Sequence, residues 1–222
     1  MVFSSQRDRS AGLYRQNADG TGEAELLLTD DDAQVLIPNS LASTGGTLVV
    51  MRRRSQRNDL TRVSLEGEPA LEVLLDSEFS EDRADVSPSG EWIAYESNRS
   101  GRNEIYIERF PDLGDRQTIS SGGGQQPRWS TDGRELFYLG PEANRLMVVP
   151  VTMGPGLDVG APDTRVEGQF LDFLGRSAYD VAPDGRVVII RRGDGTSEDA
   201  AAPRLSVVLN WHTELLERVP VN

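Results

Sequence analysis

The sequence contains no cysteine and only one histidine, His212, among 222 residues. Disulfides and thiolate metal sites are therefore excluded. No G-x-S-x-G segment accompanies the single histidine, so the sequence gives no basis for a Ser-His-Asp triad. No apolar run reaches the roughly 18 to 20 residues of a membrane span, and the N-terminal segment lacks the basic and apolar regions of a signal peptide.

Positive charge is also scarce, with 23 basic residues against 36 acidic ones and a formal net charge of −13. A nucleic acid or an anionic membrane surface needs a basic face on its partner, so neither is predicted to bind. Most of the acidic groups are interpreted as solvating loops. The length suits one domain with a sizeable core, and no feature indicates a second domain.

What the sequence does contain is a repeat, which is clearest in residues 83–110. Ser87-Pro88-Ser89-Gly90 has proline and glycine where a tight turn favours them. Runs rich in aromatic and β-branched residues follow at 91–96 and 105–110, and both have the length of a strand. A more polar segment at 115–120 is typical of a strand at the outer edge of a sheet. The unit is predicted to be a four-stranded antiparallel meander.

The turn glycine recurs along the chain as Gly46, Gly90, Gly133 and Gly185, at intervals of 44, 43 and 52 residues. The longer last interval is interpreted as extra loop at 154–156 and 168–175. A period of about 40 to 45 residues that carries four short strands is typical of propeller blades, and the helical periodicity of an α-solenoid is missing.

The sequence therefore predicts an all-β chain, a β-propeller of four-stranded antiparallel blades in a single domain. The blade-like segments are expected at 1–30, 35–76, 83–121, 126–170 and 177–210, with a capping tail at 211–222. The first segment lacks an inner strand. Either the five segments close a ring in an unusual way, or they are the C-terminal part of a larger propeller; the second is favoured, with further blades from the same longer chain or from a second copy.

Residues 87–107 combine S-P-x-G, I-A-Y-x-S-N-R-x-G and I-Y-I, and in this they resemble the WD-like repeat of TolB-type β-propellers. The S-N-R turn has counterparts in Ser5-Gln6-Arg7 and Ser55-Gln56-Arg57, whereas the Gly-His and Trp-Asp pairs of true WD repeats are missing. The V-L-N-W ending at 207–211 is similar to that of propellers attached to bacterial serine/threonine kinases. The first resemblance implies protein partners and an extracytoplasmic location, and the second implies a sensor module.

Functional side chains are expected on the innermost strands, because a propeller directs these strands toward a central channel. Alternation along each strand places positions two residues apart on one face. The predicted ligand-binding residues, obtained by aligning the repeats on the turn glycine, are Asn39, Arg83, Asp85, Gln126, Arg128 and Asp180. Two interpretations stay open: this polar ring binds a protein, a peptide or a small ligand at the channel mouth, or its members pair with one another across neighbouring blades.

No catalytic residue, metal site or cofactor is predicted. Residues 30–32 and 76–85 are rich in oxygen ligands, but they lack the helix-loop-helix calcium pattern and are interpreted as surface loops. The basic triplet at 52–54 is expected to pair with acids, and Trp92 and Trp129 are expected to pack between blades. The chain is predicted to be a non-catalytic binding module; the alternative is a propeller that regulates access to a peptidase or glycosidase site located elsewhere.

Overall fold

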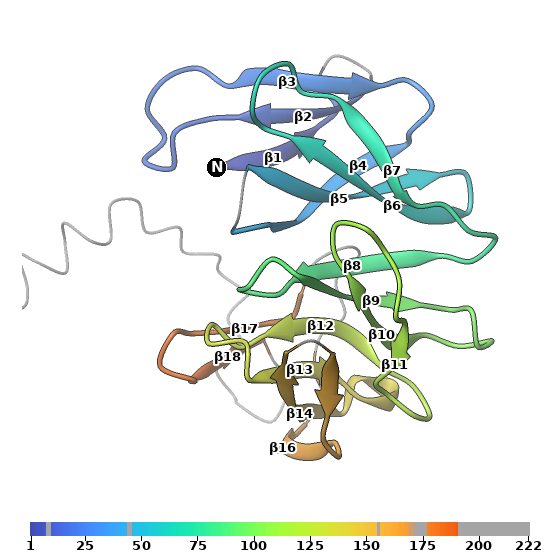
Figure 1. The fold of residues 1–222 in the computed structure, drawn as a ribbon. Helices are drawn as coiled ribbons and strands as arrows, with labels where there is room; N and C mark the ends of the chain where they lie inside the picture. Colours follow the sequence, from blue (N-terminus) through green and yellow to red (C-terminus); the bar gives the residue numbers. More distant parts are fainter. Residues whose placement is uncertain (8–9, 44–45, 155, 169, 171–176, 191–222) are drawn as a thin grey trace, which may run out of the picture.

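The computed structural model of the chain describes residues 1–7, 10–43, 46–154, 156–168, 170 and 177–190 (Figure 1). Within these residues the regular structure consists of eighteen β-strands and one short 3-10 turn, Pro141–Ala143. None of the described segments forms a helix with the length and apolar character needed to cross a bilayer. The all-β prediction is confirmed.

The strands form five antiparallel sheets that follow one another in chain order. Sheet 1 contains β1 (Val2–Ser5), β2 (Ala11–Arg15) and β3 (Glu25–Asp30). Sheet 2 contains β4 (Val35–Leu41), β5 (Thr47–Arg54), β6 (Arg57–Ser64) and β7 (Leu71–Leu75). Sheet 3 contains β8 (Glu81–Val86), β9 (Trp92–Ser97), β10 (Glu104–Arg109) and β11 (Gln117–Thr118).

Sheet 4 contains β12 (Gln125–Trp129), β13 (Glu135–Leu139), β14 (Arg145–Met153), β15 (Leu157–Val159) and β16 (Asp163–Glu167). Sheet 5 contains β17 (Tyr179–Val181) and β18 (Val187–Ile189). Figure 1 shows this order as a progression from the blue and cyan strands of sheets 1 and 2, through green sheet 3, to the yellow and orange strands of sheets 4 and 5. Sheets 2 and 3 are the predicted four-stranded meanders.

The turn glycines behave as the repeat predicts. Gly46, Gly90, Gly133 and Gly185 all adopt positive φ angles, of 62°, 75°, 71° and 78°. Glycine takes this conformation without the steric cost that a Cβ atom would add. In three of these turns the glycine N–H donates to the carbonyl three residues earlier, as Gly90 does to Ser87 at 2.8 Å. Each such turn joins the first two strands of its sheet.

Strand β9 is buried along its whole length because sheet 3 lies between two other sheets. Ile93 and Tyr95 pack in a cluster shared with sheet 2, whereas Trp92 and Ala94 pack in a cluster shared with sheet 4. Alternate side chains thus enter different cores, which explains a continuous apolar run where a half-exposed strand would alternate. Trp129 lies in the same cluster as Trp92, so both tryptophans are core residues, as expected.

The sequence predicted extra loop at 154–156 and 168–175 as the cause of the long interval between Gly133 and Gly185. Loop alone does not account for this interval. Gly154 does lie in a turn, where its N–H donates to the Gly156 carbonyl at 2.9 Å. The residues that follow form β15 and β16, and both of these strands pair with β14. The nine residues of β14 offer enough edge for two short partners. Part of the added length is therefore strand that widens sheet 4.

Several predictions fall outside the described residues. These are the strand expected at 205–210, the V-L-N-W resemblance at 207–211, and the tail at 211–222 with His212. The same holds for most of the segment 168–175.

Candidate functional site

The innermost strands of sheets 2, 3 and 4 are irregular at equivalent places. The pairing register shifts between Pro38 and Ser40 in β4, between Asp82 and Asp85 in β8, and between Gln125 and Arg128 in β12. Such bulges redirect the side chains that follow them. The strict alternation used to align the inner strands therefore fails here.

In two of these bulges a residue other than glycine takes a positive φ angle. Arg83 has φ of 50° and Gln126 has φ of 56°. This conformation is unfavourable for a residue with a Cβ atom, and it persists only where surrounding contacts hold it. The contacts of Arg83 and Gln126 supply that restraint, as described below.

The bulged strands surround a cavity of about 480 Å³, which we call the central cavity. Its lining includes residues 2–4 of β1, four residues of β4, Arg83 and Ala84 of β8, Arg128 of β12, and Ser177 just before β17. Strands of sheets 1 to 4, together with the segment just before sheet 5, thus contribute to one hollow. Three of the six predicted ligand-binding residues line it: Asn39, Arg83 and Arg128.

The other three predicted residues have different places. Asp85 accepts a hydrogen bond from Arg128 Nη1 at 3.3 Å and another from the Trp129 backbone N–H at 2.9 Å, so it joins sheets 3 and 4. Gln126 is fully buried. Asp180 is exposed and does not line the central cavity.

Gln126 links sheets 3, 4 and 5. Its side-chain oxygen accepts from the Ala178 N–H at 2.7 Å, and its carbonyl accepts from the Tyr179 hydroxyl at 2.6 Å. Its own N–H donates to Glu96 Oε2 at 3.0 Å. Pairing of the predicted residues with one another across neighbouring blades, one of the two interpretations left open by the sequence, therefore accounts for Asp85 and Arg128, whereas Gln126 bonds to residues outside the predicted set.

Glu96 is a site residue that the sequence reasoning missed. It lies at 4% exposure directly behind Arg83, whose Nη1 donates to its two carboxylate oxygens at 3.1 and 3.0 Å. Asn103 Nδ2 approaches the same carboxylate at 3.3 Å. The signal that could have revealed it is a glutamate at the end of an apolar run too continuous for a strand with a solvated face.

Burial raises the pKa of Glu96 to about 7, against an ordinary value of 4.5. The positive charge of Arg83 lowers this pKa, and the negative charge of Asp82 raises it further. Burial also raises the pKa values of Asp82 and Asp85, although Arg83 and Arg128 respectively oppose the shift. Three carboxyl groups and two guanidinium groups thus form the ionisable shell of the central cavity.

Two buried polar atoms beside the central cavity have no hydrogen-bond partner among the described residues. They are the Nε atom of Arg128, a donor, and the Oδ1 atom of Asn39, an acceptor. Leaving a buried polar atom unsatisfied costs about 1 to 3 kcal/mol. The lining also includes apolar side chains, among them Val35 and Ile37 of β4 and Phe3 of β1.

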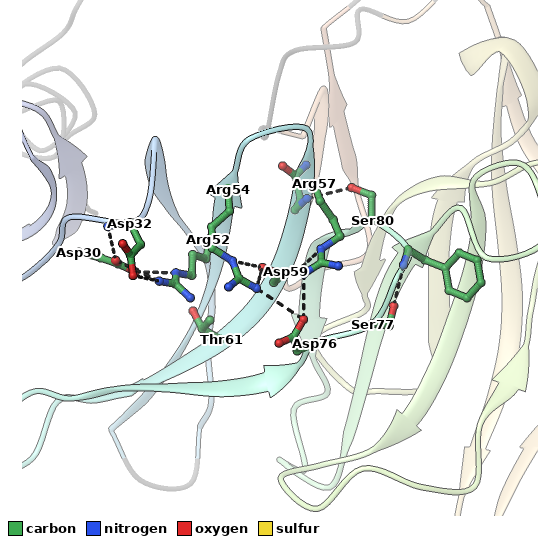
Figure 2. A network of polar contacts seen from close by, with 12 residues as sticks. Asp30, Asp32, Arg52, Arg54, Arg57, Asp59, Thr61, Asp76, Ser77 and Ser80 are labelled. Carbon is green, nitrogen blue, oxygen red and sulfur yellow. Dashed lines mark hydrogen bonds and ion pairs between the residues drawn. The ribbon is translucent and has the colours of Figure 1, made fainter.

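A second hollow, of about 550 Å³, lies at the turn between β5 and β6 and is also lined by arginines. Figure 2 shows that these arginines are engaged by acids of the fold. Arg54 approaches Asp59 at 2.6 Å, and Arg57 lies 3.0 Å from both Asp59 and Asp76. The arginines of both hollows are paired with acids, but the second hollow is lined only by residues 54–57, 78, 80 and 98, which come from two neighbouring sheets and the connection between them. It is therefore the weaker candidate for a ligand.

The expected pairing of the basic triplet is likewise confirmed for two of its members. Arg54 pairs with Asp59, and Arg52 lies 2.5 Å from Asp30 with both side chains 12% exposed (Figure 2). The Arg52–Asp30 pair connects sheet 2 to sheet 1. Asp30, considered above as an oxygen ligand, thus serves as an ion-pair partner.

Five successive antiparallel sheets around a central cavity define the class of the fold as a β-propeller, and comparison with known structures narrows it. TolB from Acinetobacter baumannii matches with a TM-score of 0.63 and 15% identity, over 87% of this chain and 46% of that one. A TolB-type protein of Agrobacterium tumefaciens matches with a TM-score of 0.59 and 19% identity, over 75% and 61%. The fold is that of a TolB-like β-propeller.

Other comparisons set the limits of this likeness. A periplasmic gluconolactonase from Pseudomonas aeruginosa matches with a TM-score of 0.56 and 16% identity, over 80% of this chain and 56% of that one. No protein-family model and no curated protein matches the sequence. The chain spans less than two thirds of the length of each TolB structure.

Proposed function

We propose that the chain is a non-catalytic binding module whose ligand or protein partner engages the central cavity. The observation that carries this proposal is the lining itself. Strands β1, β4, β8 and β12, together with Ser177 just before β17, line one hollow, and the charged residues among those lining it are Arg83 and Arg128. A cavity of about 480 Å³ is within the size range of small-ligand sites.

The two charged residues that line the cavity are both basic, and the carboxylates of Glu96 and Asp85 pair with them. The chain carries a net charge of −13, and all of its 23 basic residues are arginine. Glu96 fixes Arg83 and Asp85 fixes Arg128 from behind, so both guanidinium groups are oriented before any ligand arrives. Preorganisation of this kind lowers the entropic cost of binding.

The finer parts of the proposal rest on resemblance. TolB-type propellers imply a protein partner outside the cytoplasm, and the V-L-N-W ending of kinase-attached propellers implies a sensor in a longer polypeptide. An immunoblot of native cells with an antibody against residues 1–222 tests the latter. A band far above 24.4 kDa supports a longer protein, whereas a band at 24.4 kDa contradicts it.

Partner capture tests the site. Immobilised wild-type chain should retain a specific partner that the Arg128→Gln variant loses. Glutamine can still donate to Asp85, which also keeps its hydrogen bond from Trp129, and a thermal melt checks that the variant is folded before capture. Arg134→Gln is the matched control, because Arg134 is 84% exposed and does not line the cavity. Equal retention by both variants would contradict the proposed site.

The absence of catalysis needs its own test, because a gluconolactonase shares the fold. Purified wild-type chain should hydrolyse neither sugar lactones nor peptides above the uncatalysed rate. A turnover that copurifies with the chain and falls in the Arg128→Gln variant would overturn the non-catalytic part of the proposal.

A further inference from the structure

The central cavity is lined by both charged and apolar side chains, and these restrict the chemistry of its occupant. Arg83 and Arg128 supply positive charge, and Asn39 and the apolar residues Val35 and Ile37 come from β4. An anion is the natural partner of a pair of guanidinium groups, which match the planar geometry of a carboxylate. The apolar residues need an apolar group in return.

Two polar side chains of the lining sharpen this requirement. Arg128 carries guanidinium N–H donors, and the amide of Asn39 carries an acceptor oxygen. A carboxylate oxygen can accept from the Arg128 guanidinium group, and an amide N–H can donate to the Asn39 side chain. One group that carries an amide N–H, an apolar side chain and a carboxylate is the last residue of a peptide. An N-acyl amino acid has the same chemistry.

The ionisable shell adds a constraint. When all groups are ionised, three carboxylates stand against two guanidinium groups, so an incoming carboxylate adds to an existing excess of negative charge. The groups that face Glu96 are Asp82 and Arg83 from β8, the Gln126 N–H from β12 and the Asn103 amide ahead of β10. A proton on Glu96 would offset the charge of the ligand.

We infer that the central cavity binds a chain-terminal carboxylate whose last residue has an apolar side chain, and that Glu96 takes up a proton as this ligand binds. This inference rests on the proposed binding function and specifies the ligand. The carboxylate lies against Arg83 and Arg128, the amide N–H donates to Asn39, and the side chain packs on Val35. The proton comes from solvent, and no covalent bond changes.

Calorimetric titration of the full chain with N-acetyl-leucine tests the ligand class. N-acetyl-leucinamide is the control that lacks the carboxylate, and hexanoate is the control that keeps the carboxylate but lacks the amide N–H. The acid should bind at least tenfold more tightly than either compound at pH 6. Arg128→Gln should weaken its binding at least tenfold, whereas Arg134→Gln should not change it. Failure of the acid to bind at 10 mM, or equal binding of the amide, would overturn the inference.

Titrations in buffers of different ionisation enthalpy measure proton uptake. Near pH 7 the wild type should take up a substantial fraction of a proton per ligand, and its affinity should fall from pH 6 to pH 8. Glu96→Gln should bind with no uptake and with an affinity independent of pH over this range. Uptake that persists in Glu96→Gln would refute the role of Glu96.

Two further experiments follow. The first distinguishes a protein C-terminus from a free acyl amino acid as the ligand, and the second distinguishes failure of this inference from failure of the proposed function. An octapeptide with a free C-terminal leucine should bind at least as tightly as N-acetyl-leucine if a protein terminus is the ligand; tighter binding of the small acid indicates a free acyl amino acid. A captured partner that Arg128→Gln loses but N-acetyl-leucine does not displace would overturn this inference while leaving the proposed function intact.

Discussion

Replacement of Glu96 by glutamine should remove a pH dependence of stability that the buried carboxyl group creates. Glutamine keeps the size and shape of the side chain, but it cannot ionise. The pKa of Glu96 is raised to about 7 in the folded chain, and its ordinary value is 4.5. The folded state therefore holds the proton more tightly than the unfolded state over this interval.

The sign of the effect follows from proton binding. Where the folded state binds more protons, the free energy of unfolding falls as pH rises. The contribution of Glu96 is thus fully present below about pH 4.5 and is lost as pH rises through 7. Between pH 5 and pH 8 this difference in pKa corresponds to about 2.5 kcal/mol.

Urea denaturation of the wild type and of Glu96→Gln at several pH values between 5 and 8 measures this contribution. Glu81, Asp82, Asp85 and Glu108 also have raised pKa values and add slope in the same direction. They are present in both proteins, so the difference between the proteins reports Glu96 together with its charge coupling to Asp82. Relative to the wild type, the variant should gain about 2 to 3 kcal/mol of stability from pH 5 to pH 8. A difference that stays constant within about 0.5 kcal/mol would refute the reasoning.

Further predictions concern the turns and the connections between sheets. Gly90→Val should lower stability by about 1 to 2 kcal/mol, because Gly90 has φ of 75°. Gly114→Val is the control and should have little effect, since nothing lies within 4 Å of its added Cβ. Thermal melts compare the two variants, and equal melting temperatures would contradict the turn assignment. Arg52→Met alone should cost about 3 kcal/mol by leaving Asp30 buried without its partner, and Asp30→Leu in addition should recover much of this loss. A double variant no more stable than the single one would argue against the pair.

Much of the fold was predictable because the repeat carries its own markers. The turn glycines mark where the first strand of sheets 2 to 5 ends and the second begins, and their positive φ angles show why glycine recurs there. The runs predicted at 91–96 and 105–110 from aromatic and β-branched composition overlap β9 and β10 to within one residue at each end. Strand β16 escaped prediction because Asp163–Glu167 is polar and pairs at the far side of β14.

The site was less predictable because bulges have no clear marker in the sequence. Arg83 and Gln126 take positive φ angles that their residue types do not favour. Alternation placed both of them on the channel face, but Arg83 lines the cavity whereas Gln126 is buried between sheets. The continuous apolar run before Glu96 indicates a buried strand end, but the partners of Glu96 could be assigned only once sheet 3 was known to be covered on both faces. The partners of these side chains depend on contacts between sheets, which spacing in one sequence does not reveal.

The central claim is that binding takes place in the central cavity, and filling the cavity tests it most directly. Ser4 lines the cavity from β1, where an aromatic residue suits a strand, so Ser4→Trp should obstruct the hollow without removing any charge. Thr118→Trp on the exposed outer strand β11 is the control. The dissociation constant of the captured partner should rise at least tenfold for Ser4→Trp and stay unchanged for Thr118→Trp, with both proteins folded. An unchanged dissociation constant for Ser4→Trp would contradict the account.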